Sequence, residues 1–294
     1  MSTPDNLGGF SAEYQHVMAA NVTLHSRLAK EYNAVEPHFR PENIARVDER
    51  LRASFARAGD VRRLLDLGCG TGFMIQIAKK VVAEIDGIDA TASMLAVVDR
   101  EGPAQIRLFE GDTGSYPIES GRYDAVTAYS FLHHLYDIRP TLATARRALR
   151  PGGVFYSDLD PNYYFWDAIK GLNPAAEYDP IVSREIGAVT AKDEEIEAKF
   201  GVSKDVFNQA EYGKAVAGGF KEEDLARELR GAGFIDIQIQ YYWFVGQGAL
   251  VNAPGRDTAG AQGDARLVEG LLERALPLSR TLFKYVGFTA IAGS

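Results

Sequence analysis

Cysteine, basic charge and long apolar runs are scarce in this chain of 294 residues. A single cysteine, Cys69, cannot form an internal disulfide and suits a reducing compartment, so we expect a cytoplasmic protein. The formal net charge of −8 at pH 7 argues against a nucleic-acid partner, which would require a basic face. No apolar run has the length of a membrane span.

What the chain does contain is an alternation of apolar strands and amphipathic helices that begins near residue 61. Such alternation predicts a parallel sheet with helices on both faces. The expected strands are 63–67, 83–88, 105–109, 123–129 and 153–159, followed later by 234–245 and 281–292. The expected helices are 41–58, 73–80, 92–100, 139–149, 222–232 and 265–276.

The most informative segment is the first strand and the turn after it, Leu64-Leu65-Asp66-Leu67-Gly68-Cys69-Gly70-Thr71-Gly72. Glycine at every second position lets the backbone turn sharply and lie against a ligand. The helix that follows would direct its N-terminal N–H groups at the same ligand. A tight turn without a ligand is the plainer alternative. Cys69 is expected to fill space in this turn, since no activating base is evident.

Acidic residues follow the next two strands. Asp89 ends the second strand and is placed to accept hydrogen bonds from both hydroxyls of a ribose, or to cap the helix that begins near Thr91. Asp112 follows the third strand within Gly111-Asp112-Thr113. This ordered set resembles the class I S-adenosylmethionine-dependent methyltransferases, and the resemblance covers residues 61–160 well.

The resemblance implies an α/β fold: a doubly wound, mostly parallel seven-stranded sheet with an antiparallel last strand and a helical cap. It implies S-adenosyl-L-methionine as cofactor, with S-adenosyl-L-homocysteine as product. Asp66 would lie near the methionine end and Asp112 near the adenine, although an exposed turn is the other interpretation of Asp112. The expected cofactor-binding residues are Tyr32, Asp66, Gly68, Cys69, Gly70, Gly72, Asp89, Ala90, Met94, Gly111, Asp112, Thr113, Tyr129 and Ser130.

Candidate catalytic residues are His133, His134 and Asp158, which follow the fourth strand or lie in the fifth. A histidine titrates near neutral pH and could deprotonate the acceptor, although a polar structural turn would contain the same residues. Asp158, Asp160 and Asn162 could bind a cation. Tyr129 stands where metal-dependent relatives carry an acid, so we expect no metal site.

Aromatic residues after the fifth strand suggest an apolar or aromatic methyl acceptor, although core packing is an equal alternative. The expected substrate-binding residues are Tyr14, His133, Asp160, Tyr163, Tyr164 and Trp166. The segments are assigned as an N-terminal helical cap (1–58), a cofactor-binding core (59–160), a helical substrate lid (161–220) and a completion of the core (221–294).

The leading hypothesis is methyl transfer to an O, N or C nucleophile of a small molecule, mainly through proximity. The resemblance points to the small-molecule branch typified by ubiquinone and menaquinone biosynthesis. A cofactor-binding protein without transfer and a nicotinamide-dependent oxidoreductase are the alternatives. A homodimer is an open possibility for the assembly.

Overall fold

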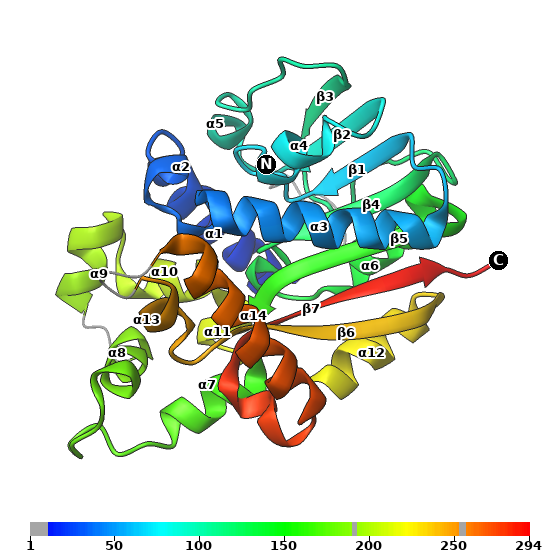
Figure 1. The fold of residues 1–294 in the computed structure, drawn as a ribbon. Helices are drawn as coiled ribbons and strands as arrows, with labels where there is room; N and C mark the ends of the chain where they lie inside the picture. The colour runs from blue at the N-terminus through cyan, green and yellow to red at the C-terminus, as the bar shows by residue number, and fades with distance from the viewer. Residues whose placement is uncertain (1–10, 190–192, 253–256) are drawn as a thin grey trace, which may run out of the picture.

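The computed structural model describes residues 11–189, 193–252 and 257–294 (Figure 1). These residues form a seven-stranded sheet in the order β3-β2-β1-β4-β5-β7-β6. Neighbouring strands from β3 through to β5 are parallel, whereas β7 runs antiparallel to both β5 and β6. The predicted doubly wound sheet with an antiparallel last strand is therefore confirmed. The strands are β1 (Arg63–Leu67), β2 (Glu84–Asp89), β3 (Gln105–Glu110), β4 (Tyr123–Tyr129), β5 (Leu149–Pro161), β6 (Phe234–Phe244) and β7 (Phe283–Ala292).

Helices cover both faces of the sheet because its central strands are apolar on both sides. In β1, Leu64 packs on one face while Leu65 and Leu67 pack on the other, and all three are fully buried. Each buried leucine stabilises the fold by roughly 1.5–3 kcal/mol. The first face is covered by α3 (Pro41–Ala58) and α4 (Phe73–Ala78), and the second by α6 (Arg139–Ala148) and α12 (Glu222–Gly231).

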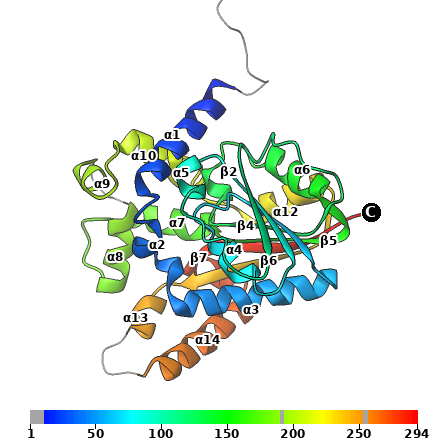
Figure 2. The same ribbon diagram turned by 90° about the horizontal axis from the view of Figure 1, so that it is seen from above.

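Most of the remaining helices gather beyond one end of the sheet, on the side where β1, β2 and β4 finish, whereas α14 (Thr258–Arg274) lies beside α3 and packs on β6 and β7 (Figures 1 and 2). The first of them, α1 (Ala12–Leu28), packs through Leu24 against Ala210 of the segment that follows β5. The others are α2 (Tyr32–Val35), η1 (Pro37–Phe39), α5 (Ala92–Leu95), η2 (Leu132–His134), α7 (Tyr163–Lys170), α8 (Pro180–Val189), α9 (Asp193–Phe200), α10 (Lys204–Ala210), α11 (Tyr212–Ala215), α13 (Gln247–Val251), α14 (Thr258–Arg274) and η3 (Leu278–Leu282).

Two predicted elements differ from the structure. The helix expected over 92–100 is only α5, because Asp99 turns the chain by accepting the Glu101 N–H at 2.8 Å and pairing with Lys79. The helix expected over 265–276 begins earlier, at Thr258, where the Asp257 carboxylate caps α14 by accepting the Gly260 N–H at 2.8 Å.

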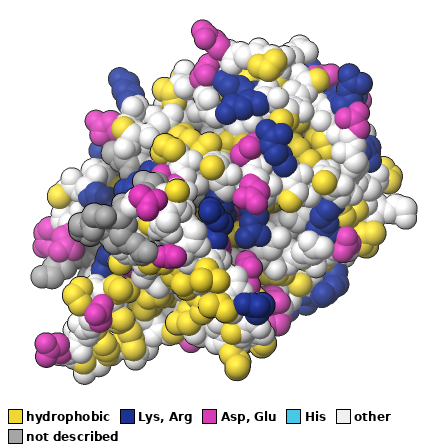
Figure 3. Space-filling view, viewed as in Figure 1, with side chains coloured by type: hydrophobic (Ala, Val, Ile, Leu, Met, Phe, Trp, Pro, Cys, Tyr) yellow, Lys and Arg dark blue, Asp and Glu magenta, His cyan; other side chains and the backbone are white. Residues whose placement is uncertain are grey.

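The outer surface carries an apolar face over α14 and η3, visible in the lower half of Figure 3. Leu267, Leu271 and Leu278 are more than half exposed there. Exposed apolar patches of this kind often contact another molecule, and the homodimer stays a prediction. Among the described residues, no helix combines the length and apolarity that a bilayer crossing requires.

Candidate functional site

The glycine turn after β1 has the backbone that its sequence predicts. Gly68, Gly70 and Gly72 have φ values of +66°, +52° and +90°, a region that side chains with a Cβ rarely adopt. A Cβ on Gly68 would lie 2.0 Å from the Phe131 ring. The N–H groups of Gly68 and Cys69 both donate to the Ile88 carbonyl, at 2.8 and 3.0 Å, which ties the turn to β2.

Cys69 serves this turn by packing. A Cβ on Gly87 would lie only 2.8 Å from the Cys69 Sγ. Because both residues are small, the turn and β2 can approach each other closely. Burial raises the pKa of the Cys69 thiol well above its ordinary value. A neutral, buried thiol is a poor nucleophile, in agreement with the predicted filling role.

The Asp89 carboxylate supports the glycine turn with both oxygens. Oδ2 accepts the Gly70 N–H at 2.9 Å, and Oδ1 accepts the Thr91 N–H at 2.8 Å. Both of the roles considered for Asp89 are therefore compatible. Each carboxylate oxygen accepts one backbone donor and keeps acceptor capacity for a ribose hydroxyl.

Asp66 lies beneath the turn and is almost completely buried. Its Oδ1 accepts the Thr127 hydroxyl at 2.7 Å, whereas Oδ2 has no hydrogen-bond partner among the described residues. Burial is the main reason that the pKa of Asp66 is raised to about 7. An unpartnered buried carboxylate oxygen suits a cationic or hydrogen-bond-donating ligand group.

The Asp112 carboxylate closes the turn after β3. Oδ1 accepts the Gly114 N–H and Oδ2 the Ser115 hydroxyl, both at 2.9 Å. The Asp112 carboxylate also raises the pKa of Tyr14 on α1, after burial as the main cause. Tyr14, expected at the acceptor, thus lies at the Asp112 end of the site.

These groups surround one cavity, which we call the glycine-loop cavity. Tyr14, Asn21 and His25 of α1 form part of its wall, opposite the ends of β1 and β2. Every predicted cofactor-binding residue lines this cavity except Gly72. Gly72 is the N-cap of α4, and a Cβ there would meet Val98 at 2.9 Å, so its role is packing of the turn.

A second cavity of about 530 Å³ lies beside the first, and we call it the insertion cavity. Phe200, Phe207 and Glu211 line it from the segment inserted after β5, and Trp243 and Tyr285 line it from β6 and β7. The two cavities share five wall residues, namely His25, Tyr32, His38, Ser130 and His134. Ser130 has φ +50°, and strained backbone at a non-glycine residue is typical of functional sites.

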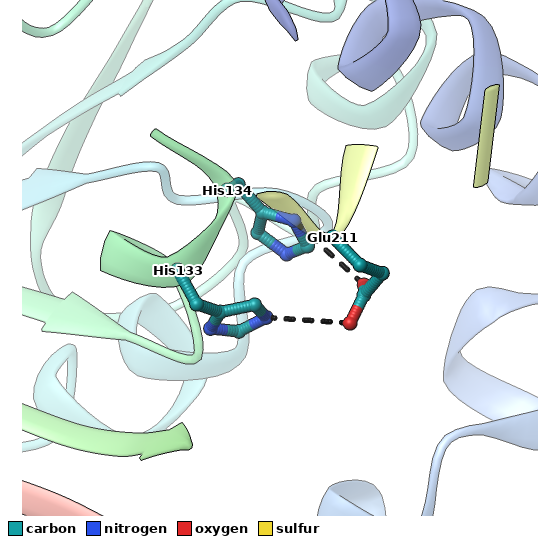
Figure 4. Close-up of side chains that lie close together, drawn as sticks. All are labelled: His133, His134 and Glu211. Carbon is teal, nitrogen blue, oxygen red and sulfur yellow. Dashed lines mark ion pairs between the residues drawn. The ribbon is translucent and has the colours of Figure 1, made fainter. Parts of the chain in front are cut away.

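His133 and His134, both predicted to be catalytic, lie at the insertion cavity. His133 is buried there, and its Nδ1 lies 2.9 Å from the Asp160 carboxylate, which also accepts the His133 N–H at 3.0 Å. Asp160, expected to contact the acceptor, therefore positions His133 instead. Glu211 faces both histidine rings (Figure 4). Nothing in the sequence around Glu211 indicated this position.

Residues 65–157 match the family model described as a methyltransferase domain. Together with the sheet order and the glycine-loop cavity, this match shows that residues 65–157 form a methyltransferase domain of the class I S-adenosylmethionine-dependent type.

Curated relatives of this methyltransferase domain include ubiquinone biosynthesis O-methyltransferases. The protein from Thiobacillus denitrificans is 31% identical over 160 residues, covering 50% of this chain and 66% of the relative. That from Aromatoleum aromaticum is 33% identical over 113 residues, covering 35% and 46%. The chain thus spans less than two thirds of the length of these relatives.

Solved methyltransferase structures share the fold. Phosphoethanolamine N-methyltransferase 2 from Haemonchus contortus, in complex with phosphomonomethylethanolamine and S-adenosylhomocysteine, superposes with a TM-score of 0.56 at 16% identity. The alignment covers 97% of this chain and 61% of the nematode protein.

The structure argues against the expected catalytic role of Asp158. Asp158 is fully buried, pairs with Arg46 at 2.9 Å and accepts the Tyr156 hydroxyl at 2.7 Å. It lines neither the glycine-loop cavity nor the insertion cavity. The Asp158 carboxylate faces α3, whereas Asp160 faces η2, because the strand is bulged between Ser157 and Asp160, where Leu159 has φ +67°.

Asp158→Asn tests this interpretation. It should lower the free energy of unfolding by about 3–5 kcal/mol, because the Arg46 guanidinium loses its buried counter-charge. The affinity for S-adenosylhomocysteine should stay within about twofold of the parent, as about 0.4 kcal/mol corresponds to that factor. Denaturant unfolding and calorimetry measure the two quantities. A lost turnover at unchanged stability would restore the catalytic role.

The aromatic run after β5 also has a different place from the one expected. Trp166 is buried in a cluster with Phe165 and Ile169. The Tyr164 hydroxyl donates to Glu223, and the Arg280 guanidinium lies 3.5 Å from the centre of the Tyr164 ring. Tyr163 lines a separate groove. These three rings line neither the glycine-loop cavity nor the insertion cavity.

Cofactor affinity should depend on pH through Asp66. In the free protein its raised pKa of about 7 keeps it protonated in acid, and a cationic cofactor group nearby would favour the carboxylate. Binding then releases a proton, so affinity should fall by up to about tenfold per pH unit below pH 7 and level off above it. Calorimetry between pH 5.5 and 8.5 measures this. Asp66→Asn should abolish the dependence of the affinity on pH. Equal affinities of the parent across this pH range would contradict the role of Asp66.

Proposed function

We propose that this protein transfers a methyl group from S-adenosylmethionine to an oxygen or nitrogen nucleophile of a small molecule. The observation that carries the proposal is the pair of adjoining cavities, which share the wall residues Tyr32, Ser130 and His134. A donor in the glycine-loop cavity and an acceptor in the insertion cavity would meet at this wall. Holding the two reactants aligned at about 3–3.5 Å supplies much of the catalysis.

The residues of the glycine-loop cavity suit the cofactor at each of its parts. The absence of a Cβ on Gly70 leaves room for a ligand, Asp89 keeps acceptor capacity for ribose, and the unpartnered oxygen of Asp66 suits the ammonium group. The Asp112 carboxylate would accept a hydrogen bond from the adenine amine. The cofactor supplies the electrophilic methyl group on a sulfonium, and the residues hold it in place.

The acceptor cavity combines aromatic rings with titratable groups, which refines the expectation of a purely apolar acceptor. Phe200, Phe207 and Trp243 offer a surface for an apolar or aromatic body. His133, His134 and Glu211 offer hydrogen-bond acceptors for a polar nucleophile. The curated relatives are O-methyltransferases, which favours a hydroxyl as the group methylated.

We assign activation of the nucleophile to the His–Glu cluster, by which we mean His133, His134 and Glu211. Asp160 orients His133 through Nδ1, so the Nε2 atom faces the cavity as an acceptor. A hydroxyl that loses its proton on this side becomes a far better nucleophile toward the sulfonium methyl.

The test is calorimetric titration with S-adenosylhomocysteine, followed by incubation with labelled S-adenosylmethionine and a panel of phenols, catechols and amines. Binding with transfer of label supports the proposal. Tight binding without transfer to any acceptor favours the alternative of a cofactor-binding protein. Saturation by NADH but not by S-adenosylhomocysteine would favour the nicotinamide alternative, against which the family match counts.

A further inference from the structure

The His–Glu cluster brings together three potential metal ligands from two distant parts of the chain. His133 and His134 lie in η2 directly after β4, and Glu211 lies between α10 and α11 of the insertion (Figure 4). His133 Nε2 lies 3.9 Å and His134 Nδ1 3.8 Å from the Glu211 carboxylate, and one potential ligand atom of each residue lies within 4.8 Å of the others. All three line the insertion cavity.

Hydrogen bonds fix which ring nitrogens are available. His134 Nδ1 lies 2.7 Å from the Ala210 carbonyl, which can only accept, so Nδ1 carries the proton and Nε2 has a free lone pair. His133 Nδ1 lies 2.9 Å from Asp160, whose carboxylate also accepts from the Ser157 hydroxyl and the His133 backbone. Carboxylate and carbonyl partners of this kind orient histidines that bind metals.

Charged side chains of both signs surround the cluster. Two carboxylates lie next to the imidazoles: Asp160 is 2.9 Å from His133 Nδ1, and Glu211 faces both rings. Lys214 is 3.9 Å from Glu211, the His25 ring lies 4.8 Å from that of His134, and Glu36 lines the same cavity. Neutral imidazole and ionised carboxylate are the forms that bind metals.

The separations fit a bridging ion better than direct contact. A charge-assisted hydrogen bond would bring nitrogen and oxygen to about 2.7–2.9 Å. Ligands at about 2.0–2.2 Å from a tetrahedral zinc lie about 3.3–3.6 Å from each other. The 3.9 Å between His133 and Glu211 is closer to the second geometry, and the torsions of Glu211 can close the difference.

We propose that His133, His134 and Glu211 bind a divalent transition-metal ion such as Zn²⁺, with its open position toward the insertion cavity. Two imidazoles and a carboxylate plus an open position form a typical catalytic zinc site, and nitrogen ligands disfavour Mg²⁺. A catalytic role of the ion deepens the proposed function and rests on it. Metal binding itself does not depend on the proposed function.

In that role the ion binds the acceptor hydroxyl and lowers its pKa. The hydroxyl proton leaves to solvent, the oxygen forms a bond to the methyl carbon, and the bond from that carbon to sulfur breaks. The products are the methyl ether, neutral S-adenosylhomocysteine and one proton.

The experiment uses full-length, untagged protein treated with a chelator and then titrated with Zn²⁺ against a chromophoric competitor. We expect about one equivalent to bind with a Kd on the order of 1 µM or tighter. Co²⁺ should give the intense visible absorption of a tetrahedral site, and Mg²⁺ should not compete. Glu211→Gln and His134→Ala should each weaken Zn²⁺ binding by at least about tenfold, since even outer partners of a metal site contribute that much.

Two controls accompany these variants. Glu36→Gln changes an acid of the same cavity outside the cluster and should leave the Zn²⁺ affinity unchanged. S-adenosylhomocysteine titrated into metal-free Glu211→Gln should bind as to the parent, which shows that the variant is folded. Failure of that binding in the parent would count against the proposed function alone. The metal site would be overturned if the parent did not bind one equivalent of Zn²⁺. It would also be overturned if Glu211→Gln bound Zn²⁺ with the parental affinity.

Discussion

Gly70→Ala is expected to weaken S-adenosylhomocysteine binding by at least about 100-fold, which corresponds to about 2.7 kcal/mol. Gly70 lines the glycine-loop cavity, and a Cβ there would stand in the space of the ligand, with Met94 Cε at 3.6 Å as its nearest neighbour. The substitution should leave the fold intact, because no protein atom lies closer to the new methyl group. Calorimetry gives the affinity, and thermal unfolding checks the fold.

Gly121→Ala is the matched control. Gly121 has φ +67°, close to the +52° of Gly70, and has no neighbour within 4 Å of an added Cβ. Both variants therefore carry a similar cost of about 1–2 kcal/mol for a left-handed alanine. Only Gly70→Ala should lose the ligand. Similar affinities for the two variants would show that the cofactor does not lie against this turn.

His133→Asn is expected to lower kcat by about 10²–10³-fold. The asparagine amide can still donate to Asp160, but no ring Nε2 remains to face Glu211 and the acceptor. Because His133 lines the insertion cavity and not the glycine-loop cavity, S-adenosylhomocysteine should bind as to the parent. Initial rates with a saturating acceptor and calorimetry separate the two effects.

His16→Asn serves as its control, since His16 is an exposed histidine on α1 that lines neither cavity. Its kcat should equal that of the parent. A His133→Asn enzyme with more than a third of the parental kcat would remove the cluster from the chemistry, leaving proximity as the mechanism.

The sequence predicted the core of the fold because its signals there are local. Strand β4 was expected at its observed bounds, and β1 also, because apolar runs of five to seven residues between turn signals are typical of buried parallel strands. The glycine turn, Asp89 and Asp112 each follow a strand end, and parallel strands bring such ends together. The residues that line the glycine-loop cavity at these strand ends could therefore be predicted almost completely.

The acceptor side could not be predicted in the same way. Glu211 reaches the histidines because the insertion packs directly on η2, with Gly213 against the His133 backbone, and no periodicity in the sequence predicts that contact. Tyr164 and Trp166 looked like a substrate wall because aromatic composition does not distinguish a cavity from a hydrophobic cluster. Asp158 and Asp160 differ by two positions, yet one pairs with α3 and the other with η2.

The division of the His–Glu cluster between two parts of the chain has an evolutionary consequence. Its histidines belong to the scaffold that carries the donor, whereas Glu211 and the rings of Phe200 and Phe207 belong to the inserted segment. Recombination that exchanged this segment would replace the groups that select the acceptor and a group that activates it in a single event. New acceptor specificities could then arise by exchange of this one segment, while the cofactor-binding part of the chain stays unchanged.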